Sequence, residues 1–319
     1  MLELRQLNVF LEAAETANFT EAAGRLHMTQ PSVSQQIRNL ERQLGVELFK
    51  REGRQVALSD AGMALVPLAR RLVNQAVAIE ETMRSLQGEV YGHLHVGCST
   101  TPGKYILPLL LTEFHRQYPQ VRVSCRVSTQ TMSLESLNRG EVQFALSSQP
   151  TTMYDHVEFQ PFMRDEIVMI VPRKHRWATR RSIMPDELHE AEYIFRENSS
   201  GTQTVVNETL AAAGVSIRDL NTLLVLGNSE AIALAVQEGL GAGFVSRIVV
   251  DRLVMEQVAI VPVEGVRFSR QICFGRYTGQ PATNAQEAFW HFVNDNPNIY
   301  SRLSTIQADL KNGAPVASV

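Results

Sequence analysis

The stretch that decides the fold runs from residue 19 to residue 48, FTEAAGRLHMTQPSVSQQIRNLERQLGVEL. It predicts two short helices joined by a tight turn at residues 28–31. Four apolar residues of the second helix recur at spacings of four, three and four and therefore share one buried face: Val33, Ile37, Leu40 and Leu44. Its other faces carry amides, hydroxyls and arginines, which suit a helix that reads base edges in the major groove of DNA. An ordinary amphipathic helix with a solvated polar side fits the same pattern.

Composition bounds the class of protein without deciding between these readings. The chain has 319 residues, enough for two or three domains, and is 44% apolar and 20% charged, as soluble globular proteins are. Its net charge is -3, and residues 1–58 balance seven cations against seven carboxylates, so composition alone does not predict a nucleic-acid partner. We find no run of eighteen apolar residues and no signal-like N-terminus, so we expect no membrane span and a cytoplasmic protein.

The segments on either side of this stretch complete a small domain. Leu4 to Ala14 has the apolar stripe of a first helix, and Thr20 is the expected N-cap of the second. Gly45 is placed to end the third helix. Two extended runs then flank Glu52-Gly53 and predict a hairpin wing over residues 48–58. Three cations at the tip of this wing suit contacts with DNA phosphates: Lys50, Arg51 and Arg54.

A long helix is predicted from residue 59 to about residue 88, with a local kink at Pro67 in its second or third turn. Apolar residues recur in it every seven positions, as in a coiled coil: Leu65, Leu72, Ile79 and Leu86. An isolated helix would leave this row in water, which favours pairing with the same helix of a second copy. Packing of the helix on its own C-terminal domain is the alternative.

From Gly92 the pattern changes to short β-rich runs alternating with helices, which predicts a parallel α/β sheet. The alternation restarts near Tyr193, so two α/β units of similar size are expected. Late strands near residues 259–263 and 271–274, and a closing helix at 285–295, complete the pattern.

Residues 1–60 resemble the winged helix-turn-helix of the LysR-type transcriptional regulators. The resemblance is carried by the core Q-P-S-V-S-Q-Q-I-R-N-L-E at residues 30–41, by LF-x-R at 48–51 and by ALSDAG at 57–62. It implies a winged helix-turn-helix DNA-binding domain at 1–58, a linker and dimerisation helix at 59–90, and an effector-binding domain at 91–303. The effector-binding domain would be like periplasmic binding proteins, with subdomain I at about 92–161 and 268–300 and subdomain II at about 162–267. Residues 304–319 are expected to be a disordered tail.

The resemblance also implies partners and contact residues. The partners are double-stranded promoter DNA, a small-molecule effector and further copies of the chain, as a homodimer or homotetramer. DNA contacts are expected from the following residues: Thr29, Gln30, Pro31, Ser32, Ser34, Gln35, Arg38, Lys50, Arg51 and Arg54. The chain departs from the family at Asn39, where many members carry a second arginine, at Gln143, often acidic, and at Ser246-Arg247, which replace a common proline.

Hydroxyl and amide side chains crowd the loops that follow the predicted strands. Ligands of open α/β sheets bind beyond these strand ends, beside helix N-termini that favour anions. We therefore expect a small anion at some of these residues: Ser99, Thr100, Thr101, Gln130, Ser147, Ser199, Thr202 and Asn228. Ser99, Thr100 and Thr202 match positions where family members contact effectors. The alternative for each residue is that it caps its own helix.

Catalysis, metal binding and cofactor binding find no support in the motifs. The chain lacks G-x-S-x-G, the phosphate-binding G-x-x-x-x-G-K-[ST] and metal-ligand spacings, so no catalytic residue, metal site or cofactor is predicted. Two alternatives stay open at this point. One is a redox-responsive regulator that uses Cys98, and the other is an α/β enzyme with a DNA-binding head, using Cys98 with His93 or His95.

Overall fold

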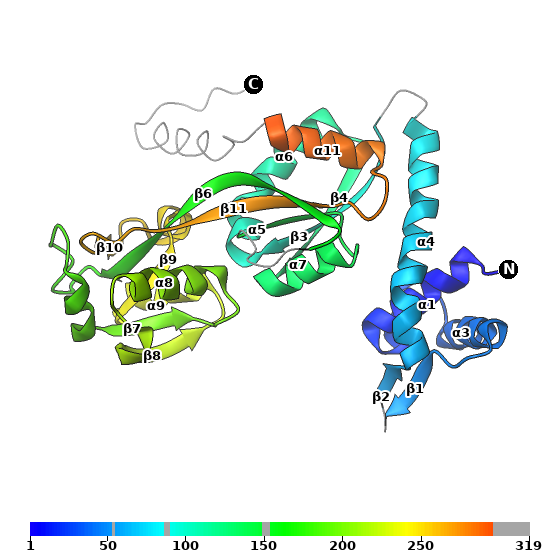
Figure 1. The fold of residues 1–319 in the computed structure, drawn as a ribbon, viewed down its shortest axis with the longest axis horizontal. Helices are drawn as coiled ribbons and strands as arrows, with labels where there is room; N and C mark the ends of the chain where they lie inside the picture. The colour runs from blue at the N-terminus through cyan, green and yellow to red at the C-terminus, as the bar shows by residue number, and fades with distance from the viewer. Residues whose placement is uncertain (53–54, 86–89, 149–153, 296–319) are drawn as a thin grey trace.

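The computed structural model describes residues 1–52, 55–85, 90–148 and 154–295. An N-terminal head and a long helix lie at one side, and two α/β lobes follow one another away from them (Figure 1). The expected tail at 304–319 lies outside the described residues. No helix within the described ranges is both long and apolar enough to cross a lipid bilayer.

The head is three helices and a two-stranded wing. Its elements are α1 (Leu4–Thr16), α2 (Phe19–Arg25), α3 (Gln30–Leu44), β1 (Phe49–Glu52) and β2 (Gln55–Leu58). Val33, Ile37 and Leu40 of α3 are buried against Leu7 and Phe10 of α1, as their spacing predicted. The fourth residue of the stripe, Leu44, packs half-buried on the same core.

The local signals that begin and end these helices are side-chain caps. Thr29 caps α3 by accepting a hydrogen bond from Ser32 N, and Gly45 ends it with φ 73°. The expected cap of α2 was wrong by two residues. Asn18, not Thr20, accepts from the first-turn backbone, because its amide oxygen reaches both Thr20 N (2.9 Å) and Glu21 N (3.3 Å).

Helix α4 (Asp60–Ser85) joins the head to the lobes and continues as one helix past Pro67, its eighth residue, where the missing N–H removes one hydrogen bond of the helix. The expected continuation to residue 88 lies outside the described residues. Gly62 allows α4 to pack closely on the head, because a Cβ atom there would lie 2.1 Å from the backbone oxygen of Leu48.

The two lobes share one nine-stranded sheet, in the order β4-β3-β5-β11-β6-β9-β7-β8, with β10 paired to β6. Lobe I contains β3 (Gly92–Ser99), α5 (Thr100–Tyr105), α6 (Leu107–Gln117), β4 (Val121–Ser128), α7 (Gln130–Asn138), β5 (Phe144–Ser148) and α11 (Asn284–Asp295). Lobe II contains β7 (Glu192–Arg196), α8 (Gly201–Ala212), β8 (Asn221–Leu226), α9 (Ser229–Gln237), β9 (Ala242–Ser246), α10 (Arg247–Val249) and β10 (Val258–Ile260).

Two long strands run through both lobes (Figure 1). β6 (Val157–Pro172) and β11 (Phe268–Tyr277) pair antiparallel, with a register shift at Ile272/Cys273. The sheet is therefore mixed and not purely parallel, because only the strands within each lobe come from strand-helix-strand units. The expected crossings at 160–161 and 266–267 fall inside or just before these strands, so the lobes divide along continuous strands and not at loops.

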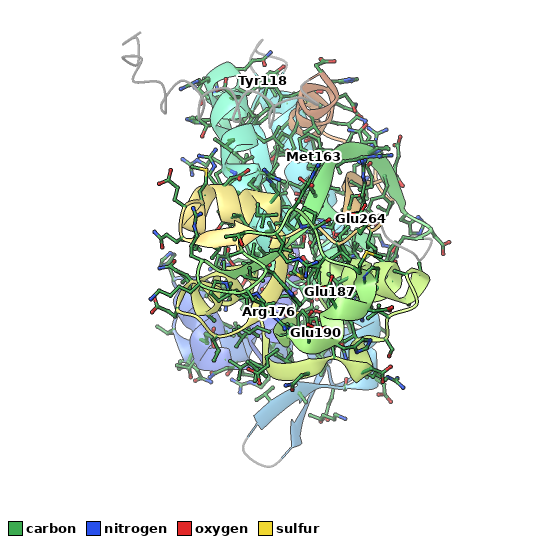
Figure 2. The ribbon with its side chains drawn as sticks, turned by 90° about the vertical axis from the view of Figure 1, so that its left-hand side faces the viewer. Tyr118, Met163, Arg176, Glu187, Glu190 and Glu264 are labelled. Atoms are coloured by element: carbon green, nitrogen blue, oxygen red, sulfur yellow. The ribbon has the colours of Figure 1, made fainter. Side chains whose placement is uncertain are left out.

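The head and α4 are joined to lobe I by polar contacts. Arg126 of β4 pairs with Glu15 of α1 (2.5 Å), and Glu81 of α4 accepts from His93 N (2.7 Å). Further contacts along α4 are Arg70 with Glu141, Asn74 with the Gly140 carbonyl, and Gln280 with the Arg71 carbonyl. Figure 2 places Tyr118 of lobe I near the top of the view and the group Arg176, Glu187 and Glu190 of lobe II below its centre.

Candidate functional sites

The polar face of α3 carries a hydrogen-bonded row of side chains. Gln35 Nε2 donates to Asn39 Oδ1 (2.8 Å), and Arg38 Nη2 donates to Gln35 Oε1 (3.1 Å). Arg42 also donates to Asn39 Oδ1. One turn earlier, Gln30 Nε2 donates to Ser34 Oγ (2.8 Å). Residues three and four apart on a helix are neighbours, so this row is a direct result of the sequence spacing.

The helix-turn-helix residues expected to contact DNA lie on one short segment. Thr29 is the N-cap of α3, Pro31 is in its first turn, and Ser32 and Ser34 follow on the first two turns. Lys50 of β1 is exposed beside this helix, while the side chains of Arg51 and Arg54 lie outside the described residues. Together the described positions form a polar surface beside the exposed Lys50 of the wing, which suits a polyanion.

A carboxylate fixes the wing to α3. Glu41 Oε1 accepts hydrogen bonds from Leu48 N (2.8 Å) and Phe49 N (3.3 Å). Since these backbone groups begin the wing, Glu41 ties its start to the end of α3. This side chain therefore has a structural role that helix periodicity alone does not reveal.

The seven-residue row of α4 is divided between two surroundings. Leu65 packs against the core of the head, whereas Leu72 and Ile79 are 46% and 58% exposed. Leu68 and Met83, at 48% and 56% exposed, extend this apolar strip. The Leu86 side chain lies outside the described residues. Exposed apolar residues in a row on one helix are typical of an interaction surface.

A narrow cleft lies between the lobes and has a volume of about 20 Å³, room for about one water molecule. Five of the residues expected at a ligand site line it: Ser99, Thr100, Thr101, Gln130 and Ser199. Gly201 of α8 brings the lobes close together, because a Cβ atom there would lie 2.2 Å from Gln130 Oε1 and 2.6 Å from Ser148 Oγ.

Several buried polar atoms around this cleft lack a hydrogen-bond partner within the described residues. They come from both lobes: Ser99 Oγ, Gln130 Oε1, Ser147 Oγ and Thr202 Oγ1. Ser147 and Thr202 do not line the cleft but are each 1% exposed beside it. Asn228 has a different role, since its side chain caps α9 by accepting from Ala231 N (2.7 Å). A buried polar group without a partner costs free energy, so the unpartnered set indicates a binding site.

Sequence reasoning missed the charged floor of the cleft. Arg270 of β11 lines the cleft and pairs with Asp165 of β6, with Nε and Nη2 both 2.8 Å from Oδ2. Nη2 is close enough for the ion pair but is not aligned for a hydrogen bond. Ser246 Oγ donates to Asp165 Oδ1 (2.5 Å), and Arg270 Nη1 donates to Ser148 Oγ (3.3 Å). One signal was present: Arg270 falls at an inward position between Phe268 and Ile272.

Other cations at the cleft are also paired with carboxylates. Arg196 donates through Nε to Glu197 (2.8 Å) and through Nη1 to Ser229 Oγ (2.8 Å). Lys104 Nζ of α5 lies 3.0 Å from Glu230 Oε1 of α9, across the lobe boundary. The groups near the cleft without a hydrogen-bond partner within the described residues are hydroxyls, an amide oxygen, one arginine nitrogen and the Glu230 carboxylate, whose charge is paired with Lys104.

Cys98 has neither the environment of a reactive thiol nor a base beside it. Its side chain is fully buried, and burial raises the pKa of the thiol to about 12. His93 and His95 alternate with it along β3 and so point to the opposite face. The two rings stack at 4.5 Å, and Ser124 Oγ lies 3.1 Å from His93 Nε2 and 2.8 Å from His95 Nδ1. Among the described residues, no cluster of three or more histidines, cysteines or carboxylates is suited to a metal ion.

Comparison with known proteins connects both sites to one class of protein. Residues 4–63 match the family model for bacterial regulatory helix-turn-helix proteins of the lysR family, and residues 87–297 match the LysR substrate binding domain. A probable RuBisCO transcriptional regulator of Cyanophora paradoxa is 32% identical over 317 residues, covering 95% of this chain and 97% of the relative.

Two solved structures of regulators or their domains resemble this chain in fold. Full-length CbnR in complex with its target DNA is 25% identical, with a TM-score of 0.65, covering 92% of this chain and 99% of that one. The regulatory domain of CcmR from Synechocystis PCC6803, in complex with 2-PG, is 25% identical with a TM-score of 0.57. This match covers 63% of the present chain and 95% of that domain.

Proposed function

The chain belongs to the LysR family of DNA-binding transcriptional regulators, and we propose that it binds promoter DNA through α3 and the wing under the control of a small anion. The proposed DNA contacts are the base edges for the polar face of α3 and the phosphates for Lys50, Arg51 and Arg54. CbnR, which has been solved with its target DNA, supports this role for the head.

We further propose that the chain acts as a homodimer, or a dimer of dimers, paired through α4. The exposed strip of Leu68, Leu72, Ile79 and Met83 supports this pairing, since burial of such a strip is favourable. Two heads related by symmetry would place two copies of α3 on two half-sites of the duplex.

The observation that carries the effector proposal is the set of unpartnered buried polar atoms around the cleft. Ser99 Oγ, Ser147 Oγ and Thr202 Oγ1 are hydroxyls that donate hydrogen bonds, and Arg270 adds a buried guanidinium. Hydroxyl donors with a guanidinium suit the oxygens of a carboxylate, sulfate or phosphate. The 2-PG complex of the CcmR domain supports a small ligand in this domain type.

Binding would act by changing the relation of the lobes. A cleft of about 20 Å³ is too small for a multi-atom anion, so the lobes must separate or their side chains must rearrange to admit it. An anion that contacts both lobes then favours one arrangement over the other, and this difference in affinity shifts the population. We propose this ligand-dependent shift, rather than catalysis, as the output of the C-terminal domain, in a cytoplasmic protein.

A thermal-shift screen of phosphate, sulfate, small carboxylates and phosphorylated intermediates tests the effector. An anion at a hundred times its Kd would raise the melting temperature by about 5–10 °C. Thr202→Ala and Thr100→Ala should reduce this rise, whereas Thr179→Ala, an exposed threonine of lobe II, should leave it unchanged. If no anion stabilises the wild type, the anionic effector is wrong.

Gel-shift titration on duplexes from the chain's own upstream region tests the head. We expect affinity to fall with salt, so that log Kd rises linearly with the logarithm of the salt concentration, with a slope of about 0.9 for each phosphate contact. Binding that survives Gln35→Ala and Arg38→Ala unaltered would count against α3 as the DNA-reading helix.

A further inference from the structure

We propose that Asn39, together with Arg38, holds the Gln35 side-chain amide in the orientation that reads an adenine in the major groove. Asn39 would thereby set the base preference of the regulator without itself contacting the base. The inference rests on the proposed DNA-binding role of α3, and it names the base that this helix recognises.

The geometry gives the two ends of the Gln35 amide different partners. On the nitrogen end, Nε2 donates to Asn39 Oδ1 at 2.8 Å. On the oxygen end, Oε1 accepts from Arg38 Nη2 at 3.1 Å. If the amide turned over, Nε2 would face the donating guanidinium and Oε1 would face the Asn39 oxygen. Both new contacts would be repulsive, so the two neighbours select one orientation.

The hydrogen-bonding capacity that remains on Gln35 matches adenine. A side-chain amide has two N–H donors and two lone pairs on its oxygen, and the network uses one of each. One N–H donor and one lone pair of the oxygen are left, on the two ends of the same amide. Adenine presents the N7 acceptor beside the N6 amino donor, which pairs with such an amide in a bidentate way. Guanine presents two acceptors, N7 and O6, and cannot satisfy the amide oxygen.

Asn39 is in turn held by Arg42, which donates to the same Oδ1 atom. Its oxygen therefore accepts from both Gln35 and Arg42 and links the second turn of α3 to the fourth. Each guanidinium has five N–H donors, so Arg38 and Arg42 keep donors for phosphates. The row thus separates base reading, at Gln35, from backbone attraction, at the two arginines.

In vitro selection with the full chain tests the inference. The probe is a library of 30-bp duplexes with a random centre, selected by the wild type, Asn39→Ala, Asn39→Asp and the control Gln43→Ala, an exposed amide of α3 outside the row. The wild type and Gln43→Ala should enrich adenine at one fixed position in each half-site. Asn39→Ala should lose that preference. Asn39→Asp should keep it, because its carboxylate oxygen still accepts from Gln35 and Arg42.

Affinity measurements on the selected duplex give a second readout. Replacing the selected adenine by 7-deazaadenine removes the N7 acceptor and should weaken wild-type binding by about tenfold, within the discrimination expected of a bidentate contact. The same replacement should weaken Asn39→Ala by less than about threefold. Because asparagine is uncharged, the salt dependence of Asn39→Ala should differ from that of the wild type by less than one phosphate contact.

The outcomes separate this inference from the proposed function. A wild type that enriches no sequence overturns sequence-specific DNA binding, and the inference with it. A wild type that enriches a motif overturns the inference alone in either of two cases: the motif is unchanged in Asn39→Ala, or 7-deazaadenine weakens both proteins equally. An unchanged melting temperature of Asn39→Ala shows that its effect is not one of folding.

Discussion

Glutamate substitutions at Leu72 and Ile79 should dissociate the proposed dimer. The strip on α4 contains four side chains that are 46–58% exposed, and complete burial of such a side chain contributes about 1.5–3 kcal/mol. Burying the remaining half of each would contribute about 3–6 kcal/mol per subunit, or about 6–12 kcal/mol per dimer. Two of the four carry half of this, so Leu72→Glu with Ile79→Glu should cost at least about 3 kcal/mol and raise Kd at least a hundredfold.

Sedimentation equilibrium over a range of protein concentrations measures this change. Met83→Glu and Met184→Glu form a matched pair, because both methionines are 56% exposed but only Met83 lies on the strip. We expect Met83→Glu to weaken association and Met184→Glu to leave it unchanged. A double variant at Leu72 and Ile79 that associates like the wild type would refute pairing through this face of α4.

Three further predictions concern stability. Gly62→Ala should destabilise the head by about 1–3 kcal/mol in urea unfolding, because its Cβ atom would meet a backbone oxygen at 2.1 Å. Gly24→Ala has open space around it and should stabilise the head by up to about 1 kcal/mol. Arg270→Ala should cost about 3–5 kcal/mol because it leaves the buried Asp165 charge unpaired, and adding Asp165→Ala should recover part of that loss. Burial raises the pKa of Cys98 from 9.0 to about 12, so unfolding releases a proton at pH values between these two. The free energy of unfolding should therefore fall as the pH rises from about 9 to 12. Cys98→Ala should make this fall smaller.

Local periodicity was sufficient for the head, because its core is built from neighbours in sequence. The apolar stripe of α3 could be read directly, and Gly45 marked its end. The cap of α2 was less clear, since Asn18 and Thr20 are both suitable residues two positions apart. Only the position of the first helical turn distinguishes them, and sequence defines such boundaries poorly.

The crossing strands were harder to predict, because their pattern depends on partners far away in the chain. Ahead of its apolar part at 167–171, β6 begins at Val157 and passes Pro161 and the charged run at 164–166. These residues read as a loop in isolation. Pairing with β11 along ten positions keeps them extended.

The candidate cleft was predicted in part. Loops after parallel strands converge by topology, which is why Ser99, Thr100 and Gln130 could be chosen from chain order. The ion pair of Arg270 with Asp165 joins residues 105 positions apart, and no local pattern links them. The row on α4 shows a third limit, since a seven-residue repeat does not reveal that Leu65 belongs to the head and Leu72 to an exposed surface.

The attachment of the head to lobe I has a consequence for how a signal leaves the molecule. Contacts of Arg126 and Glu81 hold α1 and α4 against lobe I, which also carries Gln130. The head and lobe I therefore form one unit. In an isolated copy, a rotation of lobe II about β6 and β11 would leave the position of the head relative to lobe I unchanged. In the proposed assembly, such a rotation would move a DNA-binding head only through contact of lobe II with another copy. A single chain would thus be a sensor without an output, and regulation would be a property of the assembly.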